Sequence, residues 1–150
     1  MKASKVMRLE VTTIPPEMPV DRAHGLMLKL GVRHLPVVSG HALAGIVSDR
    51  DILLVSSRDK DGRFVYPPST VGEVMSLSPE VAGPDVPVTE LARKMAEGKI
   101  DALPIVSQEN TLLGLVTSTD LLLLLTEMPA ETQPTLSYHL RRIETLRARA

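Results

Sequence analysis

The hydrophobic positions of this chain fall into two sets that follow the same order along the sequence. Early in each set, apolar residues recur three and four positions apart, the spacing that places side chains on one face of a helix. This spacing predicts helices over residues 20–30 and 88–97, with Gly31 and Gly98 as their C-terminal stops. The inward-facing residues are Ala23, Leu26, Met27 and Leu30 in the first helix, and Leu91, Ala92 and Met95 in the second.

Strand-like runs surround each of these helices. A short extended segment precedes the helix, and two apolar runs separated by turn residues follow it and predict a β-hairpin. A further helix is expected after each hairpin. The extended segments are 11–14 and 80–82, the hairpin strands are 35–39 with 43–48 and 103–107 with 112–117, and the closing helices are 49–57 and 118–128. Each set therefore has the order β-α-β-β-α.

The two sets are copies of one another. Val6 and Met7 return as Val74 and Met75, 68 positions later. After a one-residue insertion, residues 45–51 (GIVSDRD) return as residues 114–120 (GLVTSTD). Because one copy is too small to bury its apolar face comfortably, we predict an α+β fold in which two repeats pack with pseudo-twofold symmetry.

The repeat sets the expected domain boundaries. We predict the first repeat over residues 1–58, a linker over 59–69 and the second repeat over 70–128. Thr70 and Glu73 have the spacing of a capping box, which predicts the start of a short helix. Residues 129–150 are predicted to contain a linker and an amphipathic C-terminal helix, with Leu136, Leu140, Ile143 and Leu146 on one face.

Composition narrows the function classes. The net charge is −1, which gives no reason to expect nucleic acid or an anionic membrane as a partner. Three aromatic residues in 150 are too few for single-strand binding by base stacking. The absence of cysteine excludes disulfides and thiolate catalysis, and the histidines show no metal-ligand spacing. No stretch has the length of a signal peptide core or a membrane span, so a cytoplasmic protein without membrane insertion is expected.

Two pairs of polar residues follow the apolar strands, Ser48 with Asp51 and Thr117 with Asp120. In one interpretation each pair is a capping box that satisfies free N–H groups at a helix start. In the other, the carboxylate accepts hydrogen bonds from ribose hydroxyls and the hydroxyl donates to a phosphate at the helix N-terminus. Arg50 could add a charge-assisted phosphate contact, whereas its counterpart Thr119 offers only a hydroxyl.

The chain resembles a tandem CBS-domain protein, also called a cystathionine β-synthase domain pair or Bateman module. The residues that carry the resemblance are Leu-Pro-Val-Val at 35–38 with 45–51, and Leu-Pro-Ile-Val at 103–106 with 114–120. The resemblance implies a regulatory module that binds AMP, ADP, ATP or S-adenosyl methionine between its repeats and signals to an effector protein. It implies no catalytic residue, no metal and no required cofactor, and the motifs of common enzyme classes are also missing from the sequence.

The resemblance also implies the residues of the two nucleotide sites. The ribose and phosphate residues would be Ser48, Arg50, Asp51, Thr117, Thr119 and Asp120. The segments that border the adenine would contribute Val32, Arg33, His34, Pro36, Ile100, Ala102 and Pro104. The opposite wall would come from Thr13, Ile14, Val81 and Ala82. Since Arg33 and Arg50 correspond to Asp101 and Thr119, the first-copy residues are predicted to dominate binding of a phosphorylated ligand.

Five consecutive leucines at 121–125 cover every direction of a helix, so something outside their own repeat must bury some of them. The predicted C-terminal helix could fold back onto them. A second copy of the chain could also cover them, and the resemblance favours this homodimer. A structural interaction module that binds no nucleotide is the alternative to the regulatory function.

Overall fold

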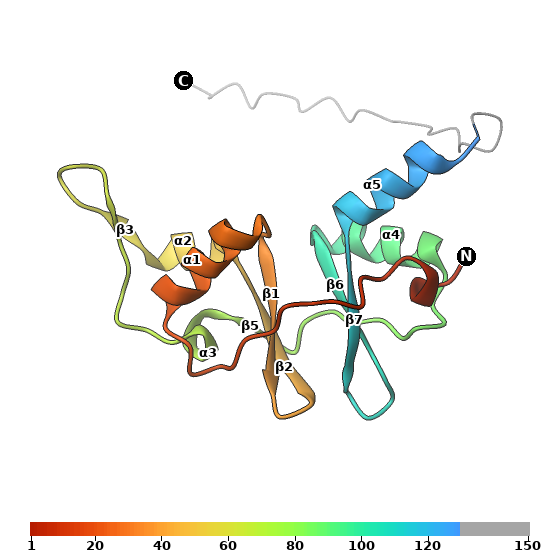
Figure 1. Cartoon of the computed structure of the whole chain (residues 1–150), viewed down its shortest axis with the longest axis horizontal. Helices are drawn as coiled ribbons and strands as arrows, with labels where there is room; N and C mark the ends of the chain where they lie inside the picture. Colours follow the sequence, from red (N-terminus) through yellow and green to blue (C-terminus); the bar gives the residue numbers. More distant parts are fainter. Residues whose placement is uncertain (130–150) are drawn as a thin grey trace, which may run out of the picture.

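The computed structural model describes residues 1–129, so the predicted C-terminal helix lies outside the described residues. Figure 1 shows two halves side by side, each built from a β-hairpin and two helices. The first half contains α1 (Val20–Leu30), β1 (His34–Ser39), β2 (Ala42–Ser48) and α2 (Asp49–Val55). The second contains α4 (Val88–Gly98), β6 (Ala102–Val106), β7 (Leu112–Thr117) and α5 (Ser118–Glu127). The predicted α+β fold of two repeats is confirmed.

The hairpins of the two repeats have the same register and touch at their tips. Leu35 pairs with Val47 in the first, and Leu103 pairs with Val116 in the second. At the tips, the Leu43 N–H donates to the Asn110 carbonyl (3.0 Å), and the Asn110 side-chain amide donates to the Leu43 carbonyl (2.9 Å). One asparagine thus joins the two sheets.

The predicted opening strands are reduced to single bridges. The Ile14 N–H donates to the Pro36 carbonyl (3.1 Å), and the Ala82 N–H donates to the Pro104 carbonyl (3.1 Å). Each contact is an isolated parallel bridge onto the neighbouring strand. The segments at 11–14 and 80–82 are therefore extended as predicted, but they do not form regular strands.

The two long helices end at equivalent positions. Gly31 ends α1 in the left-handed conformation (φ 66°), as predicted. The predicted stop at Gly98 is wrong, because Gly98 is the last residue of α4 and Lys99 takes the left-handed conformation (φ 52°). Lys99 lies 68 positions after Gly31, so the repeat keeps the conformation although the residue type that favours it has changed.

The last helix of the first repeat ends earlier than the pattern predicts. Helix α2 stops at Val55 rather than residue 57, where the Ser56 hydroxyl donates to the Ile52 carbonyl (2.7 Å) and the backbone becomes extended. A small hairpin then joins the end of the first repeat to the expected linker, with β3 (Ser57–Arg58) before the linker and β4 (Phe64–Val65) inside it, and it projects at the edge of the molecule (Figure 1).

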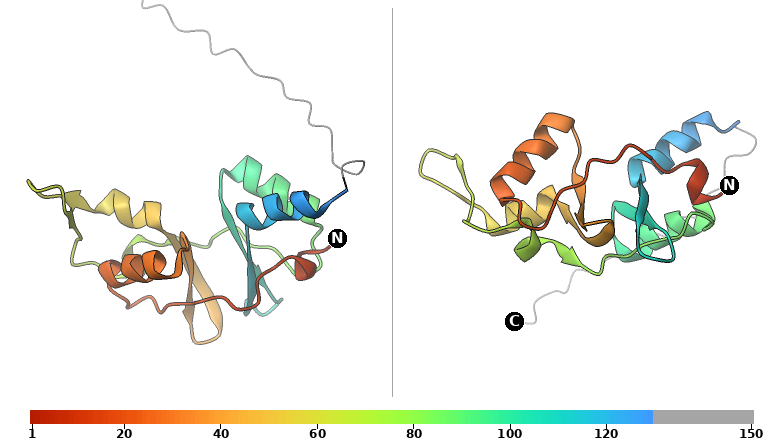
Figure 2. Two further views of the ribbon diagram at one scale, coloured as in Figure 1. Left: turned by 45° about the horizontal axis from the view of Figure 1, so that its top comes forward. Right: turned by 60° about the horizontal axis from the view of Figure 1, so that its bottom comes forward.

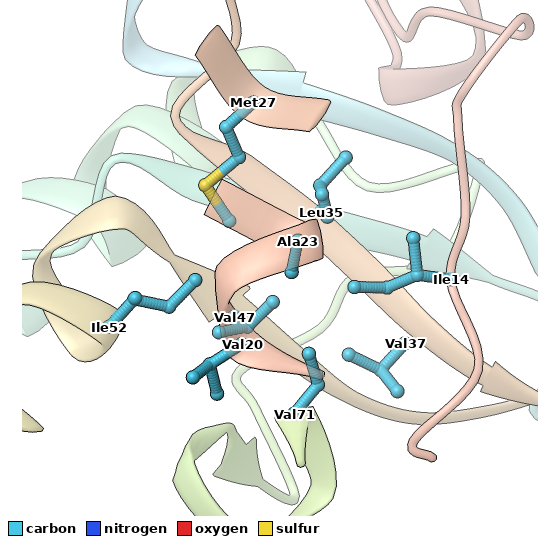
Figure 3. Close-up of a cluster of buried hydrophobic side chains, with 9 residues drawn as sticks. All are labelled: Ile14, Val20, Ala23, Met27, Leu35, Val37, Val47, Ile52 and Val71. Atoms are coloured by element: carbon cyan, nitrogen blue, oxygen red, sulfur yellow. The ribbon is translucent and has the colours of Figure 1, made fainter. Parts of the chain in front are cut away.

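The opening segment of each repeat packs into the core of the other repeat. A short helix, α3 (Val71–Val74), starts at the predicted capping box of Thr70 and precedes β5 (Ser76–Leu77), while the 3-10 helix η1 (Ala3–Lys5) opens the chain. Val71 completes the core of the first repeat, which Figure 3 shows from its side chains. Ala3, its counterpart, completes the core of the second. The N-terminal segment accordingly crosses from one half to the other (Figure 2).

Glycines of the repeated motif make room for these crossing segments. A Cβ added at Gly45 would lie 2.7 Å from the Ser76 carbonyl oxygen, and one added at Gly114 would lie 2.6 Å from that of Arg8. Ser76 lies on β5, which pairs with β2, and Arg8 forms a bridge to Leu115 on β7. Any side chain at either glycine would therefore push the crossing segment off the sheet.

Candidate functional site

The start of α2 has the geometry of a capping box with one carboxylate oxygen left over. Asp51 Oδ2 accepts from the Ser48 backbone N–H (2.8 Å) and from the Ser48 hydroxyl (2.8 Å). The Asp51 N–H donates back to Ser48 Oγ (3.1 Å). Within residues 1–129, no side chain or backbone group donates to Asp51 Oδ1. Capping and ligand binding are thus compatible here, because they use different oxygens.

The start of α5 repeats this arrangement but fills both oxygens. Asp120 Oδ2 accepts from the Thr117 N–H (2.8 Å) and hydroxyl (2.6 Å). Asp120 Oδ1 accepts from Arg8, at 2.7 Å from Nε and 2.6 Å from a terminal nitrogen. The Asp120 side chain is only 10% exposed. Burial alone would raise the pKa of Asp120, but the hydrogen bonds from Arg8 and Thr117 outweigh it and lower the pKa.

A cleft of about 190 Å³ lies beside Ser48 and Asp51. We call it the Asp51 cleft. The segment before β6, in the other repeat, lines one side of it, and Ser76 of β5 also lines it. Its lining residues are Arg33, His34, Ile46, Ser48, Asp49, Arg50, Asp51, Ser76, Lys99, Ile100, Asp101 and Ala102.

A second cleft, of about 200 Å³, lies beside Thr117 and Arg8. We call it the Thr117 cleft. The segment before β1 also lines the Thr117 cleft. Each cleft therefore combines the helix start of one repeat with a segment of the other. Its lining residues are Arg8, Gly31, Val32, Arg33, His34, Asp101, Leu115, Thr117, Ser118 and Thr119.

The two clefts share residues at their boundary. Arg33, His34 and Asp101 line both. Burial lowers the pKa of His34, and Arg33 adds to this effect while Asp101 opposes it. The imidazole is therefore neutral at neutral pH. Arg33 also pairs with Asp49 at 3.4 Å.

Most of the predicted site residues meet at these two clefts. The Asp51 cleft brings together Ser48, Arg50, Asp51, Ile100 and Ala102, and the Thr117 cleft brings together Val32, Thr117 and Thr119. Ile100 and Ala102 thus lie beside the first-copy carboxylate, and Val32 lies beside the second-copy pair. The segments before the Leu-Pro pairs face the opposite repeat's helix start.

The predicted wall residues lie elsewhere. Thr13 lines a separate hollow with Gly40 and His41, and Val81 and Ala82 line another beside Pro87. Three further predicted residues, Ile14, Pro36 and Pro104, are buried in the sheets. Their backbone pairing, described above, is the role that the structure gives them.

Sequence reasoning missed several cleft residues, among them Arg8, Ser76 and Lys99. The correspondence of Arg33 with Asp101 and of Arg50 with Thr119 predicted that the second site is poor in cations. Arg8 and Arg33, however, both line the Thr117 cleft. The signal that could have found Arg8 is the 68-residue offset, which pairs it with Ser76 just after the repeated Val-Met.

The sequence model of the CBS domain matches the chain twice, at residues 3–58 and 71–127. The chain belongs to the CBS-domain family. A CBS domain-containing protein of Bacillus subtilis, YhcV, is 34% identical over 116 residues, which cover 77% of this chain and 79% of that protein. Within residues 1–129, no helix of this CBS pair is both long and apolar enough to span a bilayer.

The CBS pair also resembles parts of longer proteins. An inosine-5'-monophosphate dehydrogenase of Korarchaeum cryptofilum is 34% identical over 119 residues, which cover 79% of this chain but only 23% of the enzyme. Among solved structures, CBSX2 in complex with AMP superposes with a TM-score of 0.70 at 27% identity, covering 82% of this chain and 94% of that one. The similarity to enzymes is thus confined to about a quarter of their length.

Proposed function

We propose that this chain is a regulatory module that binds an adenosine-containing ligand between its two CBS repeats and signals occupancy to a partner protein. The ligand class comprises AMP, ADP, ATP and S-adenosyl methionine. The chain supplies no catalysis of its own in this proposal, since the enzyme it resembles is matched over only 23% of its length.

The observation that carries the proposal is the free oxygen of Asp51. The capping box fixes the carboxylate through Oδ2, so Oδ1 is held in place and can accept from the vicinal hydroxyls of a ribose. The Asp51 side chain lines a cleft to which the opposite repeat also contributes residues. A ligand that fills the cleft therefore touches both repeats at once.

Cations around the same cleft suit a phosphate. Arg33, Arg50 and Lys99 line it, and the guanidinium groups can each offer more than one N–H to a phosphate oxygen. Asp49 and Asp101 offset part of this charge. Since the volume of about 190 Å³ is below the roughly 300–1,000 Å³ of pockets for drug-sized ligands, a nucleotide would extend from the cleft toward the surface.

The AMP complex of CBSX2 supports the ligand class, because its chain has the same fold over most of its length. The sequence alone raised the alternative of a structural module with no nucleotide. That alternative would not need a carboxylate with an unbonded oxygen in a cleft lined by arginine and lysine.

We propose that the module signals as a homodimer. Leu53, Leu54 and Val55 of α2 and Leu122, Leu123 and Leu125 of α5 are exposed, with Leu54 at 78% and Leu122 at 62%. Leucines this exposed on two helices favour association. A ligand that stabilises one relative placement of the repeats would change this dimer and so the surface offered to an effector.

A thermal-shift series tests the proposal. Wild-type protein is melted with AMP, ADP, ATP and S-adenosyl methionine, and at least one is expected to raise the melting temperature, since preferential binding to the folded state stabilises it. GTP at the same concentration is the control for anion effects. No shift with any adenosine-containing ligand at millimolar concentration would favour the structural module instead.

A further inference from the structure

The two clefts differ most at one pair of equivalent positions, Arg8 and Ser76. Both residues lie on a segment that crosses from the other repeat, and both line a cleft. Asp51 lines its cleft directly, whereas Asp120 is not a lining residue of the Thr117 cleft and is covered by Arg8, which is one. In the Thr117 cleft the Arg8 guanidinium contacts Asp120 Oδ1 through two nitrogens. In the Asp51 cleft no hydrogen bond joins Ser76 to Asp51 among the described residues. Only the second carboxylate therefore has its Oδ1 held by a side chain from the crossing segment.

The backbone of Arg8 is fixed while its side chain is accessible. The Arg8 N–H donates to the Leu115 carbonyl (2.9 Å), and the Leu115 N–H donates back (3.1 Å). The tight approach to Gly114 keeps this segment against β7. The Arg8 side chain is 56% exposed, against 10% for Asp120. The guanidinium can therefore swing away from Asp120 without moving the strand that carries it.

We propose that Arg8 makes the Thr117 cleft selective for phosphorylated adenosine ligands, while the Asp51 cleft accepts adenosine itself. This inference rests on the proposed function and assigns different ligand charges to its two sites. The oxygen that a ribose would use on Asp120 is the one that Arg8 holds. An uncharged nucleoside must displace the Arg8 guanidinium from Asp120 and offers it no negative group in exchange. The phosphate of a nucleotide can instead pair with the displaced guanidinium.

The test isolates the Thr117 cleft by starting from the Asp51→Asn variant. Calorimetric titrations with adenosine and with AMP then compare that protein with the double variant that also carries Arg8→Ser, the residue found at the equivalent position. Because a partly exposed ion pair contributes about 1 kcal/mol, we expect adenosine to bind about fivefold more tightly once Arg8 is gone. The preference for AMP over adenosine should fall about tenfold, the effect of one hydrogen bond between charged groups.

The matched control moves the arginine to the other cleft. Ser76 is exposed on β5, so Ser76→Arg in the wild-type background should fold. It is expected to weaken adenosine binding at the Asp51 cleft by about fivefold. Thermal melts and far-UV circular dichroism confirm the fold of each variant, and Arg8→Lys tests whether charge alone preserves the preference for AMP if Arg8→Ser is unstable.

The outcomes separate the inference from the proposed function. If adenosine and AMP bind but Arg8→Ser changes neither the adenosine affinity nor the preference for AMP, Arg8 is not the selecting residue and the inference is overturned. If neither ligand binds any variant or the wild type, the inference is overturned, and the proposed function fails as well only if ADP, ATP and S-adenosyl methionine also leave the melting temperature unchanged.

Discussion

Replacing Asp51 by asparagine should separate the structural and binding roles of this carboxylate. An asparagine oxygen can still accept from the Ser48 N–H and hydroxyl in place of Oδ2. The NH₂ group that replaces Oδ1 donates hydrogen bonds and cannot accept them. The helix start thus keeps its cap, while the ribose loses the group that we expect to hold it.

The two effects differ in size. Folding loses only the interaction of a negative charge with the first turn of α2, about 0.3–1 kcal/mol. Binding loses charge-assisted hydrogen bonds to the ribose, about 1.5–3 kcal/mol. That range corresponds to a drop in affinity of about ten- to 150-fold.

Isothermal titration calorimetry with adenosine measures the loss, and thermal unfolding without ligand measures the stability. The matched control is Asp120→Asn, which has the same capping geometry but an Oδ1 already held by Arg8. It should leave adenosine affinity at the Asp51 cleft unchanged. An Asp51→Asn protein that binds adenosine as tightly as wild type would refute the assignment of the ribose to Asp51.

Three further predictions concern the fold, its pH dependence and its assembly. Gly114→Ala should lower the free energy of unfolding by about 2 kcal/mol, because its Cβ would meet the Arg8 carbonyl oxygen at 2.6 Å. Gly25→Ala, which has open space around it in α1, should raise that free energy by about 1 kcal/mol. Urea unfolding compares the two variants, and equal effects would contradict the close-approach argument. Because burial lowers the pKa of His34, the unfolded chain binds the proton more readily, so the contribution of His34 to stability is complete above its unfolded pKa of about 6.5 and declines as the pH falls. His34→Gln should flatten the fall in melting temperature between about pH 7.5 and 5.5, and an unchanged slope would argue against it. Leu122→Glu should shift the protein from dimer to monomer in light scattering at micromolar concentration, and a wild-type monomer would refute the proposed dimer.

Much of the fold follows from local pattern and from the repeat. Helix α1, the hairpins of the two repeats and the three capping boxes are set by residues near one another in sequence, and the sequence predicts them. The sequence predicted the end of α4 at Gly98 because glycine favours the left-handed conformation. The 68-residue offset from Gly31 places that conformation correctly, at Lys99. The early end of α2 coincides with a side-chain hydrogen bond, from Ser56 to Ile52, that periodicity does not report.

The site was harder to predict because it depends on long-range packing. The exchange of Ala3 and Val71 between cores brings Arg8 and Ser76 to the clefts, and the sequence of one repeat carries no sign of that exchange. The same crossing gives each cleft a segment from the opposite repeat. A comparison of aligned positions within each repeat therefore identified the carboxylates but not all of their surroundings.

The most direct measurement of the central claim is a crystal structure of this chain grown with saturating AMP. The account predicts AMP between the repeats in the Asp51 cleft, with its ribose hydroxyls about 3 Å from Asp51 Oδ1. An Asp51 cleft that stays empty at saturating AMP, whether or not AMP occupies the Thr117 cleft, would contradict it.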